Sequence, residues 1–298
     1  MCILLFAGCD FSAYVEIDDR ENWLAFWGLD RLDDPSFVDP APVDPSAGDK
    51  DPEKSETGDN TGNKDSDVSD EPDIKEVDPK TLAPSFYGEA PASYFDDALF
   101  VGDSRMVGLS AYGDIDKGYW FVDKGLSTFN IKSSPHNTKK IEGLIGEGLF
   151  EILEKNEFGK VYVGLGINEC GYTLPSIDEA FGNLIKRIEE SQPDAIIYIC
   201  ANIHLTNGKS SSDKTYTNTK LNAINDLMKK YADDKTKFYI DVNSVLDDSM
   251  GCLTSTYSWD GVHLYSKYYP IWSNFIRRNA VKTYEDRLKE YLENEGRS

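Results

Sequence analysis

The sequence predicts an α/β protein in which a central parallel sheet lies between two layers of helices. Between residues 93 and 285, short apolar runs of four to six residues alternate with longer segments whose apolar residues recur at helical spacing. Strands separated by helices pair in parallel, and helices then cover both faces of the sheet. In addition, polar residues follow directly after the apolar runs, at the edge where such sheets bind ligands.

The apolar runs predict the strands, and the segments with helical spacing predict the helices. We expect strands over residues 98–101, 119–122, 160–164, 195–200 and 237–241. We expect helices over residues 138–155, 176–191, 221–231 and 265–282. Residues 176–191, for example, place Ile177, Phe181 and Leu184 on one helix face.

The segment from Ala98 to Leu109 predicts a buried strand, a sharp turn and then a helix. Gly102 supplies the permissive backbone for the turn. Ser104 opens the helix, where unpaired N–H groups and the positive end of the helix dipole favour an oxyanion. Ser104 is therefore a candidate nucleophile. The alternative is a plain helix cap, because Asp and Ser are both favoured at that position.

Other polar residues are expected at the same edge as Ser104. Gly125 follows the second strand, Gly166-Ile167-Asn168-Glu169 follows the third, and Asn202 and His204 follow the fourth. Because the carboxyl ends of parallel strands meet at one edge of the sheet, these residues should lie near Ser104.

A general base for Ser104 has to come from three histidines. His263 stands in Asp260-Gly261-Val262-His263, where one turn can present the carboxylate to one imidazole nitrogen while the other nitrogen faces the serine. His136 lies in a polar loop and His204 after a strand, and for both we favour a solvated or structural role.

These motifs resemble the SGNH (GDSL-type) hydrolases. Gly102-Asp103-Ser104, Gly125, Gly166-x-Asn168 and Asp260-x-x-His263 occur in that order over about residues 95–283. The resemblance implies a flavodoxin-like sandwich and a serine esterase. It also implies that Ser104 is the nucleophile, His263 the base and Asp260 its orienting carboxylate. The implied oxyanion hole comprises the Ser104 and Gly125 N–H groups and the Asn168 side chain. Glu169 stands where the family usually has aspartate.

The resemblance and the composition together predict the substrate class. We expect hydrolysis of an O-acyl ester, O-acetyl in the first place, on a polysaccharide, a cell-envelope glycan or another small ester, without a cofactor or metal. A long-chain lipase is disfavoured, because no apolar flap stands next to the motifs. Two alternatives stay open: an O-acyltransferase with the same triad, and a non-catalytic glycan-binding surface protein.

The rest of the chain predicts a tether. Residues 1–9 end in Leu5-Phe6-Ala7-Gly8-Cys9, which resembles a lipobox and predicts a truncated lipoprotein signal with a lipid anchor at Cys9. Residues 10–29 stay unassigned, residues 30–92 predict a disordered acidic linker, and residues 286–298 a charged tail. We therefore expect an extracellular protein, lipid-anchored at a bacterial surface or secreted.

Charge and cysteine content exclude several classes of partner and site. The net charge is −22, and residues 30–80 hold 17 acidic against 6 basic residues. This balance argues against nucleic acid and anionic lipid headgroups, both of which need clustered Lys and Arg. The five cysteines lack the C-x-x-C spacing that zinc sites use, and no apolar stretch approaches the length of a membrane span.

Overall fold

The computed structural model describes residues 85–132 and 141–295. The predicted anchor at Cys9, segment 10–29, the linker up to residue 84 and His136 lie outside these residues. The description below covers the domain that carries the motifs.

A parallel sheet forms the middle of the domain, as the sequence predicts. Within the described residues it has five strands in the order β2-β1-β3-β4-β5. The strands are β1 (Ala98–Gly102), β2 (Tyr119–Val122), β3 (Lys160–Gly164), β4 (Ile196–Cys200) and β5 (Lys237–Ile240). This is the strand order of flavodoxin-like sheets, which have their ligand crevice at the carboxyl edge beside β1.

Side chains along each strand alternate between the two faces of the sheet. On one face the rings of Phe100, Tyr162 and Tyr198 stack across three neighbouring strands, with centroid separations of 4.6 and 4.2 Å. On the other face lie buried aliphatic residues such as Val161 and Ile197. Both faces are therefore apolar and need a covering layer.

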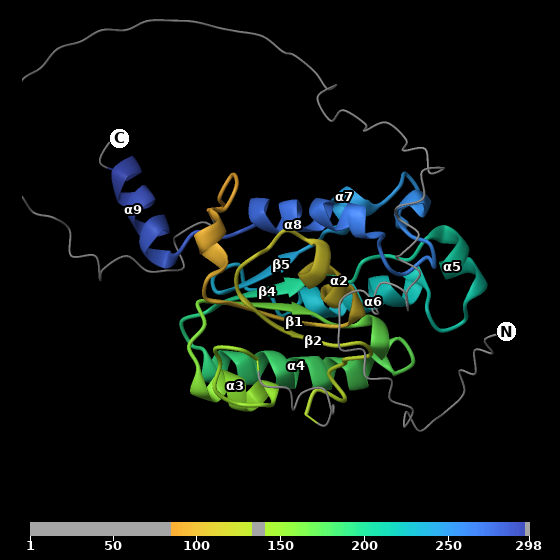
Figure 1. The fold of residues 1–298 in the computed structure, drawn as a ribbon, viewed down its shortest axis with the longest axis horizontal. Helices are drawn as coiled ribbons and strands as arrows, with labels where there is room; N and C mark the ends of the chain where they lie inside the picture. The colour runs from red at the N-terminus through yellow and green to blue at the C-terminus, as the bar shows by residue number, and fades with distance from the viewer. Residues whose placement is uncertain (1–84, 133–140, 296–298) are drawn as a thin grey trace, which may run out of the picture. The chain divides into compact units, whose positions relative to one another are not determined.

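Helices supply a layer on each face (Figure 1). One layer consists of α3 (Leu149–Lys155), α4 (Leu174–Ser191) and α6 (Asn218–Lys229). The other consists of α2 (Ser104–Tyr112), α7 (Asn243–Leu246) and α8 (Tyr269–Arg278). The predicted three-layer α/β/α architecture is confirmed.

Two predicted helices are shorter in the structure. Within the described part of the segment 138–155, which is residues 141–155, the helix begins only at Leu149, because Gly143 and Gly146 adopt φ angles of +84° and +112°, which helical residues do not have. The segment 265–282 begins as the 3₁₀ turn η8 (Ser266–Tyr268), and α8 follows from Tyr269 to Arg278.

The ends of the domain differ from the predicted linker and tail. Phe86 forms an antiparallel bridge with Val281, and the Tyr87 N–H donates to the Ala280 carbonyl over 2.8 Å. Residues 85–92, assigned from composition to the linker, thus belong to the fold. The predicted charged tail 286–298 contains most of α9 (Tyr284–Glu295), where Leu288 is buried among charged neighbours. Leu288, Tyr291 and Leu292 stand among mostly charged residues there, and so short an apolar pattern is too weak a signal to predict this helix.

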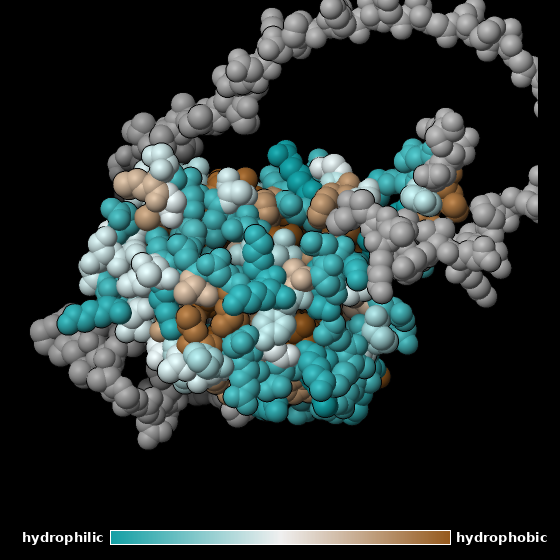
Figure 2. Space-filling view, turned by 180° about the vertical axis from the view of Figure 1, so that it is seen from behind, coloured by the Kyte–Doolittle hydropathy of each residue, from teal (hydrophilic) through white to brown (hydrophobic). Residues whose placement is uncertain are grey.

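One face of the described domain is mainly polar. Figure 2 shows one face of the molecule, on which apolar residues form separate patches between larger hydrophilic areas. Within residues 85–132 and 141–295, no helix is long and apolar enough to cross a membrane.

Candidate active site

Ser104 lies at the tight turn between β1 and α2. A Cβ atom at Gly102 would lie 2.3 Å from Cγ of Met106 and 2.9 Å from the Gly164 carbonyl, so this turn requires glycine. The cap of α2 is Asp103, whose carboxylate accepts the Arg105 N–H over 2.9 Å. The capping role considered for Ser104 thus falls to its neighbour.

The Ser104 hydroxyl is hydrogen-bonded to His263. Its Oγ lies 2.8 Å from Nε2 of His263, although the two residues are 159 positions apart in the chain. Nδ1 of the same ring lies 2.7 Å from Oδ2 of Asp260. Since an ionised carboxylate only accepts hydrogen bonds, it assigns the ring proton to Nδ1, and Nε2 is left to accept the serine proton.

Asp260 is held in its ionised form. Burial alone would raise the pKa of its carboxyl group, but the hydrogen bond and charge of His263 outweigh burial and lower it. Oδ1 also accepts the backbone N–H groups of Val262 and His263, each over 2.8 Å. The carboxylate therefore both orients the imidazole and stabilises the turn.

The turn between Asp260 and His263 is tightly packed. Gly261 has a φ of +81°, and a Cβ atom there would lie 2.5 Å from Cβ of Lys209. The Thr206 N–H donates to the Gly261 carbonyl over 3.0 Å. These contacts attach the histidine loop to the start of the short helix α5 (Asn207–Ser212).

The two other predicted oxyanion donors lie on loops that touch. Asn168 stands in the 3₁₀ turn η6 (Ile167–Glu169) after β3, and its side-chain amide donates to the Leu126 carbonyl over 2.8 Å. Gly125, directly before Leu126, has a φ of +71°. The structure thus brings Asn168 next to the Gly125 loop. Their action on an oxyanion stays a prediction.

Glu169, the departure from the family pattern, links the same two loops. It is fully buried, and its Oε1 accepts the backbone N–H of Thr128 over 2.8 Å and the Thr128 hydroxyl over 3.2 Å. Among the described residues, Oε2 has no hydrogen-bond partner. Burial raises the pKa of Glu169 to about 7, although the hydrogen bonds from Thr128 favour the ionised form.

A buried ion pair beneath the serine turn was not anticipated from the sequence. The Arg105 guanidinium contacts the Asp103 carboxylate at 2.8 Å and also donates to Oδ1 of Asn202 and to the Ile203 carbonyl. One sequence signal could have indicated that Arg105 is buried. It stands four residues before the apolar Leu109, and residues at that spacing share one face of a helix. The pair ties the start of α2 to the loop after β4.

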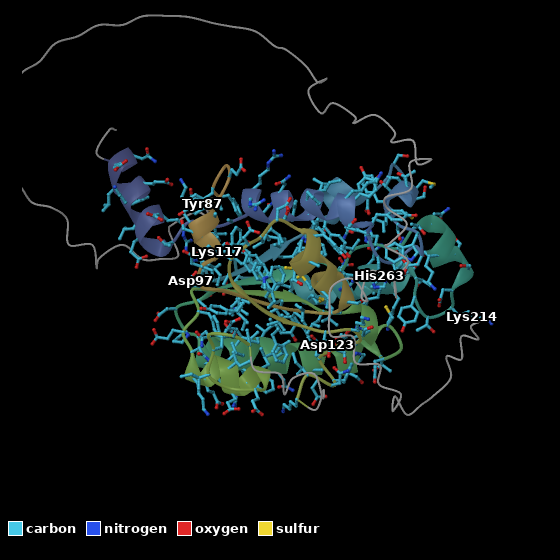
Figure 3. All side chains as sticks on the ribbon, viewed as in Figure 1. Tyr87, Asp97, Lys117, Asp123, Lys214 and His263 are labelled. Carbon is cyan, nitrogen blue, oxygen red and sulfur yellow. The ribbon has the colours of Figure 1, made fainter. Side chains whose placement is uncertain are left out.

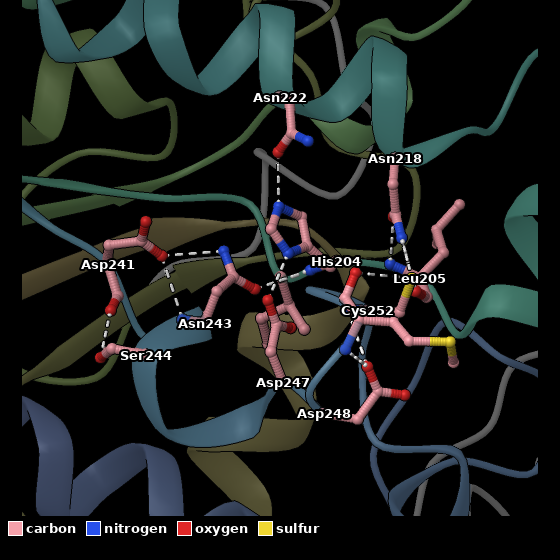
Figure 4. A network of polar contacts seen from close by, with 12 residues as sticks. His204, Leu205, Asn218, Asn222, Asp241, Asn243, Ser244, Asp247, Asp248 and Cys252 are labelled. Atoms are coloured by element: carbon pink, nitrogen blue, oxygen red, sulfur yellow. Dashed lines mark hydrogen bonds and ion pairs between the residues drawn. The ribbon is translucent and has the colours of Figure 1, made fainter.

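His204 belongs to a separate network, shown in Figure 4. Its Nδ1 lies 2.7 Å from Oδ2 of Asp247, and its Nε2 lies 2.6 Å from Oδ1 of Asn222. Burial lowers the pKa of His204, but the hydrogen bond and charge of Asp247 outweigh burial and raise it. The ring thus connects the loop after β4 with α6 and the end of α7, a structural role.

The residues of the candidate site share one end of the sheet. In Figure 3, His263 and Asp123, which directly follows β2, lie toward one end, while Asp97, which directly precedes β1, lies toward the other. Because Ser104 is bonded to His263 and Asn168 follows β3, the candidate site lies at the carboxyl edge. Within the described residues, no cluster of His, Cys, Asp and Glu is arranged to hold a metal ion.

Known proteins similar to this chain are found among solved structures. No protein-family model matches it, and no curated protein matches it. A proposed platelet activating factor from Streptococcus pneumoniae is 21% identical, with 66% of this chain and 84% of that chain covered and a TM-score of 0.46. A GDSL-like lipase from Bacteroides thetaiotaomicron is 12% identical, with 69% and 93% covered and a TM-score of 0.45.

An acetyl xylan esterase is also similar to this chain. It is 14% identical, with 60% of this chain and 96% of that chain covered and a TM-score of 0.42. At these identities and TM-scores, function has to be inferred from the geometry of the site.

Proposed function

We propose that this chain is an SGNH-type serine esterase that hydrolyses an O-acyl ester, in the first place O-acetyl, on a polysaccharide or cell-envelope glycan. The observation that carries the proposal is the hydrogen-bonded series Ser104–His263–Asp260. Its support is the position of this series at the carboxyl edge of the sheet, beside the loops of Gly125 and Asn168.

In the first half of the reaction, Oγ of Ser104 attacks the carbonyl carbon of the ester while Nε2 of His263 takes the hydroxyl proton. The negative charge that develops on the carbonyl oxygen is stabilised by the Ser104 and Gly125 N–H groups and the Asn168 amide. His263 then gives its proton to the leaving alkoxide, and an acyl-serine remains.

In the second half, water replaces the alcohol. His263 takes a proton from the water while the water oxygen attacks the acyl carbon. It then returns a proton to Oγ of Ser104 as the carboxylic acid leaves. Asp260 stays ionised throughout and stabilises the imidazolium that forms in each half, which fits its lowered pKa.

The proposal extends to location. We place the chain outside a bacterial cell, held by acylation of Cys9 or secreted. The lipobox-like Leu5–Cys9 and the acidic segment that follows support this placement.

Ser104→Ala is the direct test of the proposed function. The variant should lower kcat for p-nitrophenyl acetate by about 10³-fold or more. Adding His263→Ala should cost little further, since the two residues act as one unit. The matched control is Ser110→Ala on the same helix, because in the described part of the chain the Ser110 hydroxyl donates to the Val107 carbonyl of its own helix and not to a residue of the candidate site. Its rate should equal that of the unmodified protein.

Thermal unfolding of each variant, measured beside its rate, separates lost chemistry from lost folding. A folded Ser104→Ala protein that keeps more than about a tenth of the original rate would show that another group is the nucleophile.

A further inference from the structure

Trp259 contacts the candidate general base and is also exposed. Its indole ring stacks on the His263 imidazole, with centroids 5.9 Å apart and an interplanar angle of 23°. It also packs against Tyr265 at 5.5 Å. Even so, 36% of Trp259 remains accessible to solvent. A large aromatic surface is thus presented to solvent directly beside the reacting atoms.

The proton transfer from His263 to the leaving alkoxide indicates which part of the ester lies near the Trp259 surface. His263 can protonate the leaving alkoxide only if that oxygen lies within hydrogen-bond reach of Nε2. Nε2 is also 2.8 Å from Ser104, and it belongs to the ring on which Trp259 stacks. In the proposed mechanism the carbonyl oxygen points instead toward the loops of Gly125 and Asn168, so the alcohol moiety of the ester would lie on the Trp259 side of the site.

The neighbouring element is polar. Helix α5 has the sequence Asn-Gly-Lys-Ser-Ser-Ser, and all six of its residues are exposed or half-buried. It adjoins the loop of Trp259, because the Thr206 N–H donates to the Gly261 carbonyl and Lys209 packs on Gly261. In Figure 1 it projects from the end of the domain. Polar side chains thus lie on the element that adjoins the turn two residues after Trp259, where Lys209 pairs with Asp213 and the Ser211 hydroxyl donates to Asn207.

This combination matches the surface of a sugar. A pyranose ring has C–H-lined faces that pack on aromatic rings and an edge of hydroxyl groups that hydrogen-bond to polar side chains. A hydrocarbon alcohol would use the ring of Trp259 and leave the polar groups of α5 unused.

We propose that Trp259 and α5 form the subsite that binds the sugar ring of the leaving alcohol, with Trp259 as the specificity-determining residue. The inference rests on the proposed esterase function and adds to it the part of the substrate that the enzyme selects.

The test compares esters with and without a sugar. Release of acetate is measured for the full chain on acetylated xylo-oligosaccharides, on 6-O-acetyl-N-acetylglucosamine and on ethyl acetate, whose alcohol is too small to cover Trp259. The unmodified protein should prefer at least one sugar ester. Trp259→Ala and Trp259→Leu should each lower the ratio of kcat/KM for that sugar ester to kcat/KM for ethyl acetate by about tenfold or more, chiefly through KM.

Two further variants complete the design. Trp259→Phe keeps an aromatic face and should keep most of the preference. Phe86→Ala removes an exposed aromatic residue that pairs with Val281 at the other end of the domain, and the ratio should not change. Trp259→Leu keeps an apolar side chain against Tyr265, so the test does not depend on the folding of the alanine variant alone.

Three results would overturn the inference. One is an unmodified protein that hydrolyses ethyl acetate without preferring either sugar ester. Another is an unchanged ratio in Trp259→Ala and Trp259→Leu. The third is an equal fall of kcat on all substrates, which would mean that Trp259 only supports the His263 ring. Reaction of Ser104 with a fluorophosphonate monitors the triad separately, so absent labelling together with absent turnover would overturn the proposed function as well.

Discussion

The Ser104 hydroxyl owes its position to the residues on either side of it. Gly102 permits the turn, and Asp103 caps the helix while pairing with Arg105. Because Asp103 satisfies the helix end, Ser104 can direct its hydroxyl to His263. A serine used as the cap would instead point its oxygen at the backbone N–H groups of its own helix. At this position, a structural residue and the proposed nucleophile stand side by side.

Asn168→Ala should lower kcat for p-nitrophenyl acetate by about 10²- to 10³-fold, with little change in KM, because one oxyanion donor is lost while the nucleophile stays activated. The effect should be milder than that of Ser104→Ala. Steady-state kinetics measure it, and thermal unfolding of the same sample checks the fold. An unchanged kcat in a folded protein would limit the role of Asn168 to its bond with the Leu126 carbonyl.

At the residue scale, the sequence predicted those site residues that a fixed spacing, or a position directly after a strand, can indicate. The turn from Asp260 to His263 and the serine after an apolar run were visible, and the structure brings these three side chains into hydrogen-bond contact. The structural roles of Arg105, Glu169 and Trp259 were not anticipated. Their roles depend on burial or on a stacked partner, and both arise only when distant segments pack.

At the scale of elements, the loops after β2 and β3 behave as one unit. Asn168 bonds to Leu126 and Glu169 bonds to Thr128, so two neighbouring residues of one loop hold two neighbouring parts of the other. A glutamate side chain reaches one methylene further than the aspartate found at this place in the SGNH hydrolases that the motifs resemble. Here that longer side chain makes both of its hydrogen bonds in a fully buried site.

Glu169→Gln should remove a pH dependence of stability. The pKa of Glu169 is raised in the folded chain from 4.5 to about 7, so the folded state prefers the protonated form. Its contribution to stability is complete below pH 4.5 and is lost as the pH rises through 7. The loss amounts to about 3 kcal/mol. Glutamine keeps the acceptor for Thr128 and does not titrate.

Urea unfolding of both proteins between about pH 4.5 and 8 measures this effect. The unfolding free energy of the unmodified protein should fall relative to Glu169→Gln across that range. Parallel curves for the two proteins would show that Glu169 does not titrate in this window.

The strands and helices differ in how well the sequence pattern predicted where they begin and end. The five strands fall within about two residues of their predictions, because a short apolar run bounded by polar residues is typical of a buried strand. The helix expected over 138–155 was wrong for residues 141–148, since apolar spacing gave no weight to Gly143 and Gly146. Helix α5 has no apolar residue, and no periodicity could have indicated it.

At the scale of the whole molecule, the segment before β1 closes the domain. Ser85, Tyr87 and Ala90 form backbone hydrogen bonds with residues 277–282, and Phe86 packs edge-on against Phe238. Composition placed these residues in the linker. Their contacts are with residues far away in the chain, which no local pattern can reveal.

Two truncations should therefore differ. Removal of residues 1–84 should leave the stability and esterase activity of the domain unchanged. Removal of residues 1–92 should lower the unfolding free energy by about 3 kcal/mol, because three backbone hydrogen bonds and the Phe86 contact are lost. Urea unfolding of both truncated proteins measures the difference. Equal stability would show that residues 85–92 add nothing to the fold.

The hydrogen bond between Tyr87 and Ala280 also fixes the end of the domain at which the described chain begins. In Figure 3, Tyr87 and His263 lie toward opposite ends of the domain. The chain therefore enters the fold on the side away from the nucleophile. Any attachment made through residues that precede Ser85 would therefore pull on the domain from the end opposite the candidate catalytic edge.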